Sequence, residues 1–374
     1  METAQKLPFY AKFAFVLIIL ICITVICYTG QSILSPIMLA LLFAILLRPV
    51  TAFLNEKLRL PNVLASLTAV TLFVLFFAII FYFISTQLAG MADDWAKIKA
   101  NLFTHYSNLQ EYVRNTFNVS KSEQDQMVTK ATSGSMDSGK ALMGSTLVSF
   151  TDSLMNMILI PIYMFLILLY RTHFIKFLCK LFNEKHHPKL QDILKTIKTS
   201  VQSYIMGLLF EMIIVSVLTA VGFMIIGVKY AILLGVITGL LNLIPYLGIL
   251  IAGVLSIVAS LTGTSDLSVI VGILVVNIIV QIIDNNILVP MVVSSKVEIN
   301  SIASIVGIII GGAVAGISGM FLAIPVMAIL KVIFDRVDSL EAWGYLLGDD
   351  VPKTFRWKKP LTVVTDGPDT EKDG

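Results

Sequence analysis

Charged side chains are scarce in this chain. Only 14% of its 374 residues are Asp, Glu, Lys or Arg, whereas 57% are hydrophobic. A soluble globular domain carries about 25% charged residues, so this composition excludes a soluble fold. Several apolar runs approach the roughly 20 residues that a membrane-spanning helix needs. We therefore predict an all-α integral membrane protein.

Cysteine is rare as well, and the residues that bind metals are scattered. Cys22, Cys27 and Cys179 lie in or beside apolar runs without metal-type spacing, so we expect no disulfide. The adjacent pair His186 and His187 has no carboxylate or cysteine cluster to complete a ligand set. We predict that the chain holds no metal.

Motifs of catalysis and nucleotide binding are missing too. The chain has no Gly-rich loop ending in Lys-Ser/Thr, no His-Glu-x-x-His and no Gly-x-Ser-x-Gly. The acids in its apolar segments do not come as a matched pair in the sequence, as an acid–base site would need. We therefore expect no enzyme, no cofactor and no ATP motor. The net charge of +3 is spread over separate loops and indicates no nucleic-acid partner.

Apolar runs and hydrophilic links predict about five to six full transmembrane helices, two broken helical hairpins and a small extracytoplasmic helical segment. One run, Ile33 to Leu47, should end at Arg48-Pro49. The expected segments are residues 1–88 with the N-terminal transmembrane helices, 89–145 with the extracytoplasmic helical segment, 146–203 with a transmembrane helix and a cytoplasmic amphipathic helix, 204–334 with a transport core, and 335–374 with a cytoplasmic tail.

Basic residues predict the orientation. The stretch 171–203 holds seven Lys or Arg against two acids, which is typical of a cytoplasmic loop. The stretch 89–145 has balanced charges, so we place it outside and both termini inside. Apolar residues from Leu190 to Val201 recur at helical spacing, which favours a helix lying on the membrane surface. The tail after Val351 should be disordered, because it has little to bury.

Two apolar regions of the second half are interrupted by helix breakers. "NLIPYLG" contains Pro245 and Gly248, and "GGAVAGISG" is followed by Pro325. Broken helices in corresponding positions are a pointer to a transport site. Each could cross the membrane twice or only re-enter it, and the first could be a tight loop between two spans. The glycines expected at the second break are Gly311, Gly312, Gly316 and Gly319.

The span between these breaks is the most polar one. Asn277, Gln281 and Asp284 are spaced by four and three residues, so they share one helical face. A carboxylate at membrane depth is costly and typically marks a pathway. The alternative is that Asn277 and Gln281 only bond a neighbouring helix. Glu211, in the preceding span, is a second candidate, although it could be solvated near the cytoplasmic surface.

The chain resembles the autoinducer-2 exporter family of bacterial membrane proteins, and the resemblance in layout extends over most of its length. The motifs that carry the resemblance are Pro245-Tyr246-Leu247-Gly248, Asp284-Asn285 with Pro290, and the glycine series ending in Pro325. Asn300-Ser301 stands where the family more often has His-Pro. The resemblance implies a transporter in the bacterial inner membrane. Members are said to export a furanone-type signal of quorum sensing or to exchange sodium for protons.

These observations favour a secondary transporter or exporter of a small polar solute, coupled to protons or sodium. A sodium/proton antiporter and a membrane scaffold without transport stay open as alternatives. The expected partners are the solute, the coupling ion and the lipid bilayer, and a homo-oligomer is left open. The candidate binding residues are Asp284, Gln281, Asn277, Asn285, Glu211, Asn242 and Tyr246, and the candidate hinge residues are Pro245, Gly248, Pro290, Gly311, Gly312, Gly316, Gly319 and Pro325.

Overall fold

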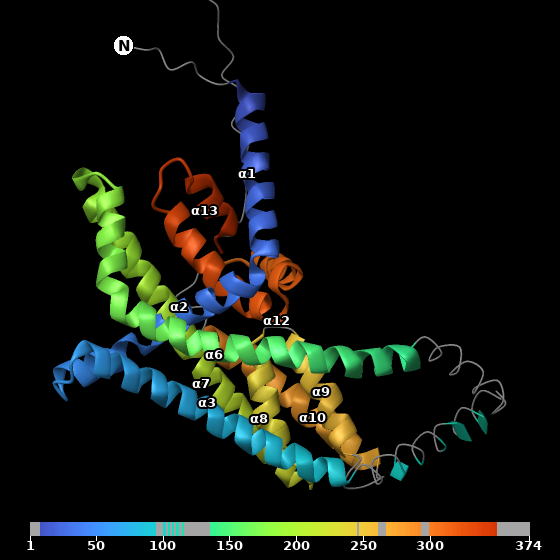
Figure 1. Cartoon of the computed structure of the whole chain (residues 1–374). Coiled ribbons are helices and arrows are strands. Elements are labelled where there is room, and N and C mark those ends of the chain that lie inside the picture. Colours follow the sequence, from blue (N-terminus) through green and yellow to red (C-terminus); the bar gives the residue numbers. More distant parts are fainter. Residues whose placement is uncertain are drawn as a thin grey trace, which may run out of the picture.

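A computed structural model describes most of the chain (Figure 1). It covers residues 8–94, single positions between 100 and 115, and residues 135–244, 247–260, 267–292 and 299–349. The regular secondary structure of these residues is helical throughout, which confirms the all-α class. Most of the expected extracytoplasmic segment, the tail from 350 onward, Pro245 and Tyr246 lie outside the described residues.

The first four helices labelled in Figure 1 are α1 (Phe9–Thr29), α2 (Gln31–Glu56), α3 (Asn62–Asp93) and α6 (Ser135–Leu181). The predicted end of α2 at Arg48-Pro49 is wrong, because the helix continues through Pro49. Proline removes only one backbone donor. Arg48 donates to Thr51 Oγ1 at 3.1 Å, and Thr51 in turn donates to the carbonyl of Arg48 at 2.9 Å. Buried Leu54 anchors the extension.

A short turn η1 (Glu184–His186) joins α6 to α7 (His187–Ile225). Here too a prediction needs correction, because the stripe from Leu190 to Val201 is no separate surface helix. It is the start of α7, which runs without interruption into the following span. At 1.5 Å per residue, 39 residues extend about 58 Å, well beyond a hydrocarbon core of about 30 Å. The buried residues of α7 begin only at Val201, so its first turns project from the core.

The first broken region forms α8 (Ala231–Asn242) and α9 (Leu247–Ser260). Helix α8 packs directly on α7 through two glycines, four residues apart, whose backbones leave no room for a side chain. A Cβ on Gly235 would meet Ala220, and one on Gly239 would meet the carbonyl of Met212. Such small-residue contacts let membrane helices approach closely.

The span after α9 consists of α10 (Leu267–Ile283), the π-helical turn η2 (Asp284–Leu288) and α11 (Val289–Val292). Pro290 lies just beyond this turn and has no N–H to donate to the residue four positions earlier. The helix widens there, and the amide of Val289 bonds the carbonyl of Asp284. Single π-helical turns occur often at functional sites.

The second broken region is α12 (Ser301–Phe334), which reverses direction at Ala315 and Gly316. Gly316 has φ 58° and ψ −142°, a backbone conformation that in practice only glycine adopts. The arms on either side have at most about 18 residues, or about 27 Å. The expected hairpin is therefore present. Helix α13 (Glu341–Leu347) folds back on α12, so the region after 334 begins with ordered structure.

Many apolar side chains lie on the outer surface of the helical bundle. Ile18, Ile79 and Ile309 are each more than half exposed, and such surface requires a lipid environment. Within the part of the chain that the structure describes, six helices are long and apolar enough to cross a membrane. One of them is α12, whose reversal leaves five continuous spans, besides the shorter α1 and the two hairpins. The buried core lies where α2, α7, α8, α10 and α12 meet.

Candidate functional site

Two acids from separate helices meet at one amide. The side-chain nitrogen of Asn242, the last residue of α8, donates to Glu211 Oε1 on α7 at 2.8 Å. The same nitrogen donates to Asp284 Oδ2 in η2 at 3.3 Å. Asn242 therefore bridges the two carboxyl groups, which we name the acid pair.

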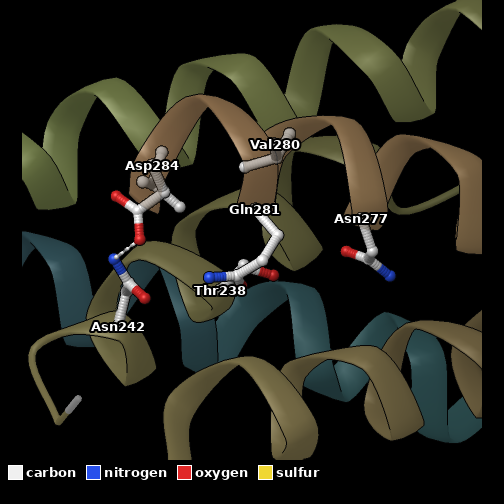
Figure 2. Close-up of a pocket in the computed structure, with 7 residues that line it drawn as sticks. Thr238, Asn242, Asn277, Val280, Gln281 and Asp284 are labelled. Carbon is white, nitrogen blue, oxygen red and sulfur yellow. Dashed lines mark hydrogen bonds between the residues drawn. The ribbon is translucent and has the colours of Figure 1, made fainter. Parts of the chain in front are cut away.

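Helical spacing brings the polar residues of α10 to this place. Asn277, Gln281 and Asp284 line one cavity and point from α10 toward the hairpin of α8 and α9 (Figure 2). The expectation that these three share a face is confirmed. From α8, Thr238 lies one turn before Asn242 and lines the same cavity. The cavity has room for roughly one water molecule, and Val215 and Val280 complete its lining.

The acid pair is buried and only partly satisfied. Glu211 is 5% exposed, Asp284 4% and Asn242 6%. Glu211 Oε2 and Asp284 Oδ1 have no hydrogen-bond partner, and neither does Asn277 Nδ2. Buried polar atoms without partners are costly and call for an explanation such as a catalytic role or an absent water or ion. The alternative that Glu211 is solvated near the cytoplasmic surface is ruled out, because its side chain is buried inside the helical bundle.

No basic side chain balances these acids within the described part of the chain. Its ion pairs join other residues, and none includes Glu211 or Asp284. Lys229, which lies between Glu211 and Asp284 in the sequence, is paired with Asp94 instead. Two carboxylates side by side in an apolar bundle repel each other. A proton or a bound cation is therefore the compensating charge that the geometry calls for.

Ion pairs lie instead at the two ends of α7. After its C-terminus, Lys229 and Tyr230 both donate to Asp94, which ties the end of α3 to the start of α8. The hydrogen bond to the Asp94 carboxylate raises the pKa of Lys229 above its ordinary value. Near the other end of α7, Lys189 bonds Asp338 at 3.0 Å, and this ammonium lowers the pKa of Asp338.

A second contact at that end of α7 reaches the segment between α12 and α13. Arg336 Nε bonds Asp192 Oδ2 at 2.6 Å, and its Nη2 bonds Thr196 Oγ1 at 2.8 Å. With the Lys189–Asp338 pair, these contacts form what we name the α7 clasp. The clasp joins the second hairpin to the helix that carries Glu211.

The candidate hinge glycines lie at close contacts or at a turn. Gly248 packs on the backbone of Leu241 where the first hairpin closes. Gly312 faces Met320 across the second hairpin, and Gly316 forms its turn. The remaining positions are Gly311 and Gly319, which face each other across the same hairpin, Pro325, which is buried in its second arm, and Pro290, which follows the π-helical turn.

Asn285 does not belong to the cavity. It follows Asp284 but is exposed on the outer side of the span, and it is not among the lining residues. Tyr246 lies outside the described residues. Within those residues no three His, Cys, Asp or Glu side chains gather as metal ligands would. His187 instead contacts the carbonyl oxygen of Cys179 at 2.8 Å.

The structure shows three features that reasoning from the sequence missed. The acids do form a matched pair, because α7 and η2 bring Glu211 beside Asp284. Thr238 joins the cavity, and its position four residues before Asn242 was the signal for it. The side-chain oxygen of Asn300 accepts a hydrogen bond from Ala303 N at 2.8 Å and so caps α12. Its side-chain nitrogen donates to the carbonyl oxygen of Leu346 at 2.7 Å. It therefore anchors α13 to the start of the second hairpin.

Comparison with known proteins is consistent with this architecture. YrrI of Bacillus subtilis (strain 168) is 34% identical over 139 residues, which is 37% of this chain and 39% of YrrI. YueF of the same organism is 25% identical over 353 residues, covering 90% of this chain and 95% of YueF. PerM of Escherichia coli (strain K12) is 26% identical over 220 residues, covering 56% of this chain and 61% of PerM.

The names of these relatives describe transport proteins for the first two and a permease for the third, each marked as provisional. The matched region spans less than two thirds of YrrI and of PerM but nearly all of YueF. The family described as AI-2E family transporter matches residues 16–339. A multi-pass helical membrane protein with this match over most of its length belongs to the AI-2E transporter family.

Proposed function

We propose that the protein is a secondary transporter of a small polar solute, driven by a proton or sodium ion that binds at the acid pair. The observation that carries this proposal is the bridge from Asn242 to both Glu211 and Asp284. Three elements contribute to it, so the charge state of the pair acts on α7, α8 and η2 together. Uncompensated acids at this depth disfavour the packed arrangement, and a proton or cation restores it.

The two hairpins give the protein parts that can move around this site. The first hairpin ends at Asn242, which contacts the acids directly. The second is joined to α7, and therefore to Glu211, through the α7 clasp. Interrupted helices around a midplane site are the usual construction of secondary transporters, in which access alternates between the two faces.

Export of an autoinducer-2-like signal from the cytoplasm, through the inner membrane of a bacterium, is the specific form that the family resemblance suggests. The basic stretch 171–203 supports cytoplasmic termini, because basic residues remain on that side.

One observation favours a sodium/proton antiporter as a second candidate. The cavity at the acid pair has room for roughly one water molecule, which suits a dehydrated ion better than an organic solute. Two carboxyl groups can exchange two protons for one or two cations. In this case the ions would be the whole cargo.

Purified protein in sealed vesicles tests the proposal. Solute and sodium fluxes are measured under imposed proton and sodium gradients for the wild type, Glu211→Gln and Asp284→Asn. We expect both variants to lose gradient-driven flux at least tenfold while they keep their helical content and thermal midpoint. Sodium-dependent proton movement without any organic solute would select the antiporter. Gradient-driven flux at the wild-type rate in both variants would overturn the role of the acid pair.

A further inference from the structure

Three helices beside the acid pair show the same order of side chains. Moving from the acid pair toward the Lys229 end of α7, each helix first presents a polar residue and then a fully buried apolar one. The successive steps are four, seven or eight residues, which are close to one or two helical turns, so the side chains stay on roughly one side of each helix. The residues are Glu211, Thr219 and Phe223 on α7, Asn242, Thr238 and Leu234 on α8, and Asp284 at the start of η2 with Asn277 and Ile273 on α10.

The apolar residues of this series form one packed layer. Phe223 and Ile273 are 0% exposed and Leu234 is 3% exposed, and all three belong to a single hydrophobic cluster. Val228 and Ala231, which flank Lys229 in the chain, belong to the same cluster. We name it the Phe223 layer. It lies between the cavity and the residues that carry the Asp94–Lys229 ion pair.

A second layer lies on the opposite side of the acid pair. About one turn and two turns before Glu211, α7 buries Leu208 and Tyr204. They pack in one cluster with Leu322 and Ile324 from the second hairpin. We name this cluster the Leu208 layer. The acid pair is thus held between two apolar layers, the first built with α8 of the first hairpin and the second with α12.

The polar stretch between the acid pair and the Phe223 layer is not satisfied. Asn277 Nδ2 and Thr219 Oγ1 are buried without hydrogen-bond partners. They lie at one level of the α7–α10 contact, because Val215 packs with Val280 on one side of them and Gly222 contacts Val276 on the other. Burying a donor and a hydroxyl without partners costs free energy when the contact between the helices excludes water. The same two groups gain hydrogen bonds when water enters the contact.

We propose that the coupling ion reaches the acid pair from the Lys229 side along this polar stretch, past Asn277, and that the Phe223 layer closes the path. The Leu208 layer closes the path from the opposite face. This inference rests on the proposed function, because it takes the acid pair as the ion site. Water enters past Asn277 when the Phe223 layer separates, and the unpartnered atoms of Asn277 and Thr219 then bind it.

Cysteine labelling tests the path separately from transport. Asn277→Cys is placed in a background with Cys22, Cys27 and Cys179 replaced by serine, and a membrane-impermeant thiol reagent is applied to either face of sealed vesicles. Lys229→Cys and Lys195→Cys report which face is labelled. Ile278→Cys is the matched control, since Ile278 is the next residue of α10 but is 58% exposed to the lipid side.

Phe223→Ala should raise the labelling rate of Asn277→Cys at least tenfold from the Lys229 face, with Ile278→Cys unchanged. Leu208→Ala should raise it only from the Lys195 face. Ile273→Ala repeats the first test if Phe223→Ala does not yield folded protein, as judged by gel filtration and the thermal midpoint. The proposed path would be overturned if labelling from the Lys229 face did not change in Phe223→Ala or Ile273→Ala. It would also be overturned if Leu208→Ala raised labelling from that face by the same factor.

The outcome is distinct from that of the flux experiment. Labelling reports a water path whether or not the protein moves an ion. The expected labelling together with unaltered flux in Glu211→Gln and Asp284→Asn would leave the path in place and reject the acid pair as the coupling site. Lost flux without the expected labelling would keep the acid pair and reject this path.

Discussion

Gly311 and Gly319 face each other across the second hairpin, and their backbones are in direct contact. A Cβ built on either residue would collide with the carbonyl oxygen of the other. The two arms therefore approach through their backbones, without intervening side chains. This contact sets the spacing of the hairpin that packs against the acid-bearing helix α7.

Gly319→Val should separate the two arms. Overpacking of a tight contact costs typically about 1–3 kcal/mol, and here the obstacle is backbone that cannot rotate away. We expect a lower thermal midpoint in detergent and reduced transport. Gly90→Ala is the matched control, because a Cβ at Gly90 finds only Tyr230 Oη at 3.7 Å. Equal stability of both variants would show that the close approach is not required.

Asp284→Asn should leave the protein folded and inserted while it abolishes or uncouples transport. The substitution removes a buried carboxylate, which is costly to bury, and keeps the side-chain shape. Asn277→Ala and Gln281→Ala should have smaller effects, because each removes one neutral ligand. The pH and sodium dependence of flux in vesicles is the measurement. A wild-type dependence in Asp284→Asn would make that residue a structural contact only.

Asn242→Ala should affect stability as well as transport. The amide donates to two carboxyl groups, and hydrogen bonds to charged groups are worth about 1.5–3 kcal/mol each. We expect a lower thermal midpoint for Asn242→Ala. Adding Glu211→Gln to this variant should partly restore the midpoint, because it removes one of the two facing carboxylate charges. A double-mutant cycle measured by thermal unfolding checks this coupling. Additive effects would show that Asn242 does not act through Glu211.

Lys195 and Lys229 should lie on opposite faces of the membrane. They are separated by most of the length of α7, which is about 58 Å long, and α7 is buried across the full width of the bundle. Single cysteines at the two positions should react with an impermeant reagent from opposite sides, and Lys195 should react from the cytoplasm. Labelling of both from one side would contradict the topology.

The α7 clasp should weaken in acid. Lys189 lowers the pKa of Asp338, so the pair contributes at neutral pH. The contribution is lost as pH falls below about 3.9, the ordinary pKa of aspartate, through the lowered pKa of Asp338. The protection of residues 335–348 against hydrogen exchange, relative to the intrinsic amide exchange rate at each pH, should fall over this range in the wild type. Lys189→Met should exchange rapidly already at neutral pH, and an unchanged rate would show that the pair does not hold the segment.

Local patterns in the sequence predicted the helices and their breaks. The glycine series at 311–319 indicated a reversal, and the structure places it at Gly316. The spacing of Asn277, Gln281 and Asp284 predicted their shared face, since helical periodicity depends only on neighbours along the chain. These features need no knowledge of the tertiary fold.

Local sequence patterns could not predict contacts between segments that are far apart in the chain. Glu211 meets Asp284 only because α7 packs against α10 and η2, with Asn242 of α8 donating to both acids, and spacing within one helix holds no information on this. The ends of helices were also misjudged. Arg48-Pro49 carries a strong stop signal, yet packing of α2 on both sides of it outweighs the loss of one backbone donor. The stripe from Leu190 to Val201 has no breaker before Tyr204, which favoured the continuous helix that the structure shows.

Because α7 is one unbroken helix, it can tilt as a rigid body about Glu211. Glu211 lies nearer its C-terminal end, and the α7 clasp holds the long arm. A tilt of roughly 5° about Glu211 would move the His187 end by about 3 Å and the Ile225 end by about 2 Å in the opposite direction, given a rise of 1.5 Å per residue. A small event at the acid pair would thus widen the bundle at one face while narrowing it at the other.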